Sequence, residues 1–343
     1  MNWTRFQRLA LTAFIAVEML IFAGAVVRAT GSGLGCPDWP FCYGCWMPPS
    51  KAQDIDFTKI NLEKFRAKAA RMGRDPATIT PESLRASFDS VATWVEYINR
   101  LISVPVGLIV LVLFGAAFAQ LRARRPFVFW ASVLALLLVF VNAWLGARVV
   151  ISALKPGIIT VHMALAIVLQ CVLVFITWRG TDAPWRVPLN SGSGILLRRV
   201  GLLLFLLVVI EGIMGSQVRE LTDRLAMLHS NASRQSWTLE LEQSAVYLVH
   251  RSFSWIIFGS TLWLTLNIKR ARGRLLWLET AILMLVMAQM LLGLVLSQAG
   301  IVRVAQILHI GLSSLLVSAL FLWLLGTGRE IVKGEVGAGA NLH

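Results

Sequence analysis

Long apolar runs constrain this chain more than any other feature of its sequence. A helix that crosses the hydrocarbon core of a bilayer needs about 20 mostly apolar residues. Eight runs reach that length, at approximately residues 8–28, 91–120, 127–149, 157–178, 195–217, 244–268, 275–298 and 303–326. A transmembrane β-barrel would show alternating segments of about ten residues instead. The sequence therefore predicts an all-α membrane protein with eight transmembrane helices.

Basic residues gather in the short links after the second, fourth and sixth runs, and they predict the orientation. They are Arg122, Arg124, Arg125, Arg179, Arg186, Arg198, Arg199, Lys269, Arg270, Arg272 and Arg274. Short basic loops stay on the cytoplasmic side, so we expect both termini in the cytoplasm, most simply that of a bacterium. The net charge of +14 then reflects membrane topology and argues against a nucleic-acid partner.

The two halves of the chain share a spaced pattern. The matching positions are Gly24-Ala-Val-Val-Arg28 and Gly215-Ser-Gln-Val-Arg219, then Gly146 and Gly293, which precede His162 and His309 by 16 residues each. Such self-similarity indicates a repeat architecture. We predict two parallel four-helix bundles, residues 1–178 and 179–343, with a long outer loop at 29–90 in the first.

Three of the five histidines, His162, His250 and His309, lie early in predicted helices near the outer face. Ionisable side chains within a bilayer are rare and are usually functional. Facing imidazoles of His250 and His309 would hold a haem iron inside a four-helix bundle, with room left by Gly293 and Gly311. The alternative is a histidine hydrogen-bonded between helices. Zinc is disfavoured, because no His/Cys cluster has metal-ligand spacing.

In the first half the equivalent pair is Asn99 and His162, and asparagine is a poor haem ligand. For this half the sequence leaves two alternatives. One is a five-coordinate iron on His162, with Asn99 beside an open position, and the other is a haem site that has been lost. Glu96 lies one turn from Asn99 and is a candidate proton acceptor, with an ion pair to Arg100 as the alternative. Arg100 and Arg251 occupy matching places, where they would bind haem propionates or snorkel to the membrane surface.

These motifs resemble those of the haem A synthase family over nearly the whole chain. Residues 27–40 (VRATGSGLGCPDWP) and Cys42-Tyr43-Gly44 are similar to the first outer loop of that family. The segment 96–101 (EYINRL) is similar to its E-x-x-H-R-L element, with Asn99 in place of the histidine. Val161-His162-Met163, His250-Arg251 and Leu308-His309 match its remaining histidine positions.

The resemblance implies an oxidoreductase that converts haem O to haem A, oxidising a ring methyl to a formyl group through successive hydroxylations. It implies a resident haem b on His250 and His309, substrate haem O on His162, and Glu96 as the catalytic carboxylate. Because Glu96 and the loop motif persist, we expect Asn99 to mark a working variant. The expected partners are a haem O synthase and an electron-transfer protein. The oligomeric state is left open, and a homo-oligomer is one alternative.

Three cysteines, Cys36, Cys42 and Cys45, lie in the outer loop, where disulfides persist outside the cytoplasm. The resemblance favours a Cys36–Cys42 bridge. A Cys36–Cys45 bridge also stays open, and the third thiol is either free or exchanges with the bridge.

Two acids, Glu18 and Glu211, lie inside apolar runs and must face the bundle interior or a partner. We assign neither a catalytic role. Two other functions stay open. A b-type cytochrome that passes electrons would account for His250 and His309 but not for Glu96 or the loop motif. A non-catalytic haem-binding or haem-delivery protein would account for Asn99.

Overall fold

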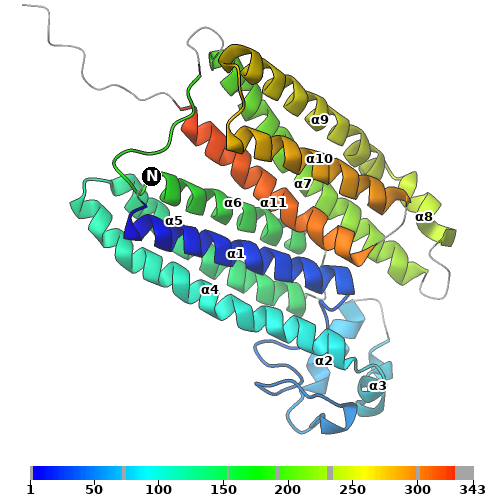
Figure 1. Cartoon of the computed structure of the whole chain (residues 1–343). Helices are drawn as coiled ribbons and strands as arrows, with labels where there is room; N and C mark the ends of the chain where they lie inside the picture. Colours follow the sequence, from blue (N-terminus) through cyan, green and yellow to red (C-terminus); the bar gives the residue numbers. More distant parts are fainter. Residues whose placement is uncertain are drawn as a thin grey trace, which may run out of the picture.

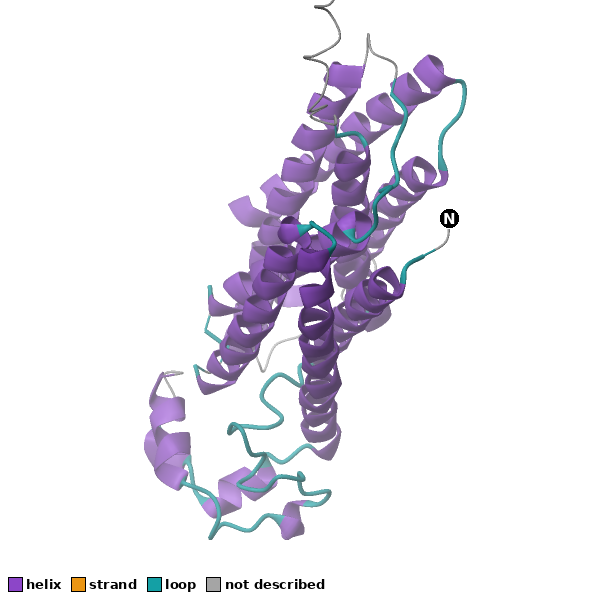
Figure 2. Cartoon of the chain, turned by 90° about the vertical axis from the view of Figure 1, so that its left-hand side faces the viewer, coloured by secondary structure: helices purple, strands orange, loops and turns teal. Residues whose placement is uncertain are grey.

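The structure is a computed structural model that describes residues 3–71, 75–152, 154–155, 157–189, 194–229, 235–298 and 302–328. Its long helices are α1 (Arg5–Thr30), α4 (Ser90–Arg122), α5 (Pro126–Ile151), α6 (Ile158–Arg179), α7 (Gly194–Leu228), α9 (Ala245–Arg272), α10 (Trp277–Gln298) and α11 (Arg303–Gly326). Short helices are η1 (Ala52–Asp54), α2 (Leu62–Arg71), η2 (Pro76–Thr78), α3 (Pro81–Ala86) and α8 (Gln235–Glu242). The described part of the chain is helical, as the sequence predicts (Figure 2).

Among the described residues, six helices are long and apolar enough to cross a membrane: α1, α4, α5, α6, α10 and α11. The two shortest, α6 and α10 with 22 residues each, extend about 33 Å at 1.5 Å per residue. That length covers the roughly 30 Å hydrocarbon core. The chain is therefore a multi-pass membrane protein. The remaining predicted runs also form helices, α7 and α9, at their expected places.

The long helices pack in two closed rings of neighbours. In the first, α4 and α6 each contact both α1 and α5. In the second, α9 and α11 each contact both α7 and α10. Consequently α4 stands across the first ring from α6, and α9 stands across the second ring from α11 (Figure 1). Each ring has its own apolar core, around Leu113 and Leu173 in the first and around Leu204 and Leu320 in the second.

The two rings meet where α11 packs against α1 and α6. A buried polar cluster lies at this junction. The Ser314 hydroxyl donates to both Glu18 oxygens, at 2.6 and 2.8 Å, and the Gln170 amide donates to Glu18 Oε2 at 2.5 Å. Glu18 thus faces the interior with polar partners, as an acid in an apolar helix must. Gly311 does not leave room for a haem ring, because Phe22 fills that space: a Cβ on Gly311 would lie 2.2 Å from its ring.

The segment between α1 and α4 forms a small unit with its own core at one end of the first ring (Figure 2). Its buried residues include Cys36, Cys42, Tyr43, Ile55 and Phe65. The start of α1 and the end of α11 lie together at the opposite end of the molecule (Figure 1). The outer loop and the two described chain ends therefore lie at opposite ends of the helices.

Helix α7 continues well past residue 217, where the apolar run ends, to Leu228. Charged residues end the hydropathy signal without ending the helix, because they pair with one another. Arg219 binds Asp223 one turn later, at 2.8 Å, and Arg28 of α1 binds the same carboxylate at 3.1 Å. This extension ties the outer ends of the two halves together.

Candidate functional site

His250 lies in the second turn of α9, and its ring rests against a glycine of α7. A Cβ added to Gly215 would lie 3.2 Å from His250 Cε1, so only glycine lets the imidazole lie this close to the helix. Glu211, one turn earlier on α7, places Oε1 at 3.1 Å from His250 Nδ1, although the pair is not aligned as a hydrogen bond. Helix α7 therefore provides both a flat surface and a carboxylate for this ring.

His309 occupies the corresponding place on α11. Gly293 of α10 faces its ring, since a Cβ there would lie 3.8 Å from Cε1. Gln289 donates to the His309 carbonyl at 3.0 Å. The two imidazoles come from helices on opposite sides of the second ring. Nδ1 of each ring is buried without a hydrogen-bond partner.

His162 repeats this arrangement in the first half. A Cβ on Gly146 of α5 would lie 3.7 Å from its Cε1, and the ring lies close to the Asn142 backbone. Its Nδ1 is also buried and unpartnered. Asn99, on α4 across the ring, has a buried Oδ1 without a partner. Gly24 is the counterpart of Gly215, but a Cβ added to Gly24 would meet no atom within 4 Å. In the other half, the His250 ring occupies the space beside the glycine.

Glu96 and Arg100 anchor the outer loop to α4. The Glu96 side chain is buried, and its Oε2 accepts from the Cys36 N–H at 2.8 Å. Arg100 pairs with Glu96 Oε1 and also donates to the Cys36 carbonyl at 2.8 Å. Its other terminal nitrogen donates to the carbonyls of Asp38 and Phe41, at 2.9 and 3.0 Å. The predicted alternative, an ion pair between Glu96 and Arg100, is confirmed.

The two arginines predicted for haem propionates differ in their surroundings. The Arg100 guanidinium is engaged by one carboxylate and three loop carbonyls, so its contacts in this structure are structural. Arg251 is exposed at the outer part of α9. Arg251 thus has the placement of a snorkelling side chain, and the propionate role of both residues stays a prediction.

The Cys36–Cys42 disulfide is present, with the two Cα atoms 4.8 Å apart, and Cys45 is a free thiol. The predicted pairing is confirmed. Asp38 shapes the enclosed turn by accepting from the backbone N–H groups of Tyr43 and Gly44, each at 2.7 Å. Burial, reinforced by Asp38, raises the pKa of Tyr43 to about 12.

Close backbone contact, as well as side-chain bonds, holds the loop on α4. A Cβ on Gly35 would lie 2.3 Å from the Ala92 carbonyl oxygen, so this position requires glycine. Thr93 donates to the Gly35 carbonyl at 3.0 Å. Asp38 and Thr93 are structural residues that the spacing analysis missed. The only sequence signal for them was their place in or next to the family motifs.

An apolar cavity of about 460 Å³ lies between α5, α6 and α7. Its lining includes Cys171, with Phe175, Phe205 and Val209 nearby. Cys171 lies among apolar side chains, where a cysteine packs as a small apolar residue. No candidate histidine lines this cavity, so the histidine sites are distinct from it.

The donor set fits a haem better than a bare metal ion. No group of three or more His, Cys, Asp or Glu side chains gathers around a point within the described residues. A porphyrin supplies four nitrogens itself and needs only one or two protein ligands. The imidazoles of His162, His250 and His309, each beside a glycine, can meet that need.

Comparison with known proteins gives a consistent match. The family model COX15-CtaA, described as cytochrome oxidase assembly protein, matches residues 7–321. The heme A synthase of Bacillus licheniformis is 23% identical over 260 residues, which cover 73% of this chain and 72% of that protein. The heme A synthase of Shewanella oneidensis is 28% identical over 145 residues, 42% of this chain and 36% of that protein.

A third relative, the heme A synthase of Alkalihalophilus pseudofirmus, is 24% identical over 164 residues, 48% of this chain and 42% of that protein. The chain thus spans less than half the length of two of these relatives. The family match, by contrast, covers nearly all of the chain. The chain belongs to the COX15-CtaA family of cytochrome oxidase assembly proteins.

Proposed function

We propose that this chain is a haem A synthase, an oxidoreductase that converts the ring methyl of haem O to a formyl group through successive hydroxylations. The observation that carries the proposal is an asymmetry between its halves. Both halves place equivalent side chains across a helical ring, but one pair is His250 and His309 and the other is Asn99 and His162. The family match and the names of the relatives support the same activity.

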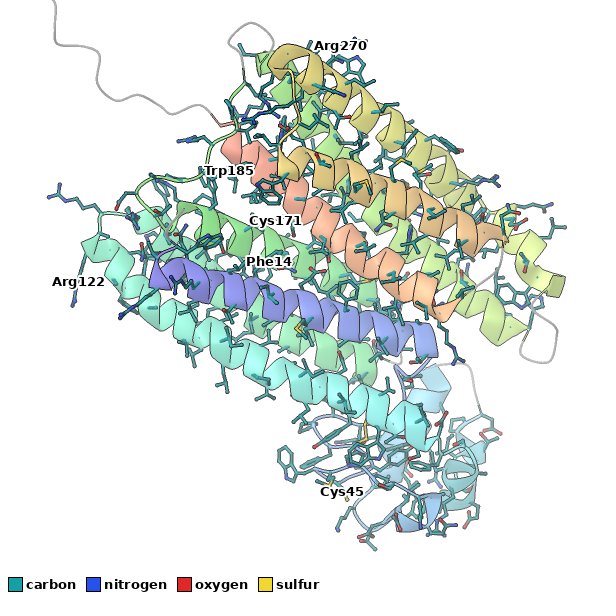
Figure 3. The ribbon with its side chains drawn as sticks, viewed as in Figure 1. Phe14, Cys45, Arg122, Cys171, Trp185 and Arg270 are labelled. Atoms are coloured by element: carbon teal, nitrogen blue, oxygen red, sulfur yellow. A yellow bond between two sulfur atoms is a disulfide. The ribbon has the colours of Figure 1, made fainter. Side chains whose placement is uncertain are left out.

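The proposed membrane arrangement has eight spans in two parallel four-helix units, residues 1–178 and 179–343. The ring of neighbours in each half and the matching glycine–histidine contacts support this repeat. Arg122 and Arg270 lie at helix ends far from the loop that carries Cys45 (Figure 3). Short basic links face the cytoplasm, which places both termini there and the disulfide loop outside.

In the C-terminal half, His250 and His309 would hold a resident haem b. Such a haem supplies one-electron transfer when it is bound. The protein supplies the two imidazoles from opposite helices, with Gly215 and Gly293 beside the rings. Each imidazole would offer one ring nitrogen to the iron.

In the N-terminal half, His162 would bind the iron of substrate haem O. Asn99 offers no strong iron ligand, and a Cβ added to Gly24 of α1 would meet no atom within 4 Å. The substrate haem would therefore be held through one strong protein ligand, as a site that must also admit a small molecule requires. The resident haem would instead be held through two imidazoles.

Glu96 would act in this half as the catalytic carboxylate. Its present contacts are the Arg100 guanidinium and the Cys36 N–H. An ionised carboxylate is the form that accepts a proton. The same contacts hold the disulfide loop at the outer end of the substrate half, so anchoring and proton transfer must be separated experimentally.

The activity is tested by producing the chain with a haem O synthase in a host that lacks haem A. The extracted haems are then separated by chromatography. We expect haem A and its hydroxylated intermediate. Haem-loaded, folded protein without either product would refute the synthase and favour a b-type cytochrome or a haem carrier.

A matched variant separates the two roles of Glu96. Glu96→Gln keeps the shape of the side chain and can still accept from Cys36, but it cannot take a proton. We expect resident haem b to be retained and haem A to be lost. Unchanged haem A formation would remove Glu96 from the chemistry and leave it as a loop anchor only.

A further inference from the structure

Glu211 is a half-buried acid that the proposed chemistry does not use. Its Oε1 lies 3.1 Å from His250 Nδ1, and its Oε2 is buried without a hydrogen-bond partner. An acid inside an apolar helix is costly unless it faces a polar partner. Here the contact is with the ring of a candidate haem ligand.

The position of Glu211 follows a pattern in the helices that face the histidines. Each of the four repeat glycines has a residue four places earlier, and therefore on the same helix face. These pairs are Leu20 with Gly24, Asn142 with Gly146, Glu211 with Gly215, and Gln289 with Gly293. The residue is polar at the three positions where the glycine faces a histidine ring, and it is leucine before Gly24, which faces open space.

The three polar residues make different contacts. Gln289 donates to the backbone carbonyl of His309 rather than to its ring. Asn142 is near His162, but its amide donates to Leu138 at 2.9 Å. Of the three, Glu211 alone places a carboxylate beside an imidazole nitrogen. Glu211 therefore differs from its counterparts in charge as well as in contact.

We propose that Glu211 is a positioning residue for His250 in the resident haem site. The carboxylate accepts the proton of Nδ1–H after a small rotation of the ring, which leaves Nε2 to face the iron. Partners of this kind fix the tautomer of a metal-bound histidine and raise its basicity. A more basic imidazole favours ferric iron. The inference rests on the proposed function, because it assumes a haem on His250.

The experiment compares Glu211→Gln with the wild-type chain as purified haem-loaded protein. Mediated redox titration gives the midpoint potential, and electron paramagnetic resonance of the ferric form reports the axial ligands. We expect Glu211→Gln to keep both histidine ligands. At a fixed ambient potential, its ferrous-to-ferric ratio should rise about tenfold, equivalent to about 59 mV for one electron.

Glu18→Gln is the matched control, because it makes the same change at another buried intramembrane acid. Glu18 bonds to Ser314 and Gln170 at the junction of the two rings. We expect its midpoint potential to equal that of the wild type. An equal shift in both variants would mean a general effect of buried charge and would overturn the positioning role.

A second variant keeps the proposal testable if Glu211→Gln does not accumulate. Glu211→Asp retains the charge but withdraws it by one methylene, so it should shift the potential in the same direction by less. If the substituted proteins keep the wild-type midpoint potential and resonance signal, the role of Glu211 is refuted, whereas the resident haem site is not. A wild-type chain without a bis-histidine haem would instead refute the resident site of the proposed function.

Discussion

The anchoring of the disulfide loop by Arg100 makes a quantitative prediction. Arg100→Gln removes the cation from Glu96, whose side chain is only 4% exposed, while that of Arg100 is 17% exposed. Leaving a buried charge without its partner costs about 3–5 kcal/mol. The arginine is partly exposed and the freed loop carbonyls regain water, so we expect the lower end, about 3 kcal/mol. We expect this loss of free energy to weaken the docking of the loop on α4 and to leave the packing of the helical rings unchanged.

Hydrogen exchange measures this loss directly, because loop opening exposes the backbone N–H groups of Cys36, Tyr43 and Gly44. A change of about 3 kcal/mol corresponds to roughly a hundredfold faster exchange, at 1.4 kcal/mol per tenfold. Peptides from the helix interiors should exchange as in the wild type. Adding Glu96→Gln to the Arg100 variant should restore part of the protection, since no buried charge then lacks its partner.

Arg66→Gln is the matched control within the same loop unit. Arg66 pairs with Glu63 at 2.7 Å, but both side chains are exposed, at 40% and 78%. Exposed pairs contribute at most about 1 kcal/mol, so exchange near Cys36 should not change. Equal protection in the wild type and Arg100→Gln would refute the anchoring argument.

Three further outcomes follow from the sites. His309→Ala should abolish the bis-histidine optical spectrum, and its retention would exclude His309 as a ligand. Gly215→Ala forces the ring of His250 to move, because the new Cβ would lie 3.2 Å from Cε1, so haem retention on purification should fall. Tyr43 has a pKa raised from 10.0 to about 12, so the loop should lose stability between these pH values. Tyr43→Phe should abolish that dependence in a pH-resolved exchange measurement.

The positions of the long helices follow from hydropathy because a bilayer demands long apolar segments. Helix α11 begins and ends at the predicted residues, 303 and 326. Helix α7 shows the limit of this signal, since its outer part is stabilised by the Arg219–Asp223 pair rather than by apolarity. A hydropathy reading cannot detect a helix that continues through paired charges.

The glycine–histidine spacing indicated a repeat but not a contact. In the structure Gly146 faces the ring of His162, and Gly293 faces the ring of His309. Gly311 was misread, because a glycine marks close packing without showing which side chain fills the space, here Phe22.

The contacts of Glu96 were only partly predictable. Helical spacing placed it on one face with Asn99 and Arg100, but it could not show that a loop distant in sequence would cover that face. The bond from the Cys36 N–H joins residues 60 positions apart. Such a contact depends on how the loop folds back, which no local pattern encodes.

The unequal halves are the central claim, and electron paramagnetic resonance of the ferric protein loaded with haem b and haem O tests it most directly. The wild type should show one bis-histidine low-spin signal, from His250 and His309, and a second haem with different ligation. Asn99→His should convert that second haem to a bis-histidine signal. Two bis-histidine signals in the wild type, or a second signal unaffected by Asn99→His, would contradict the account.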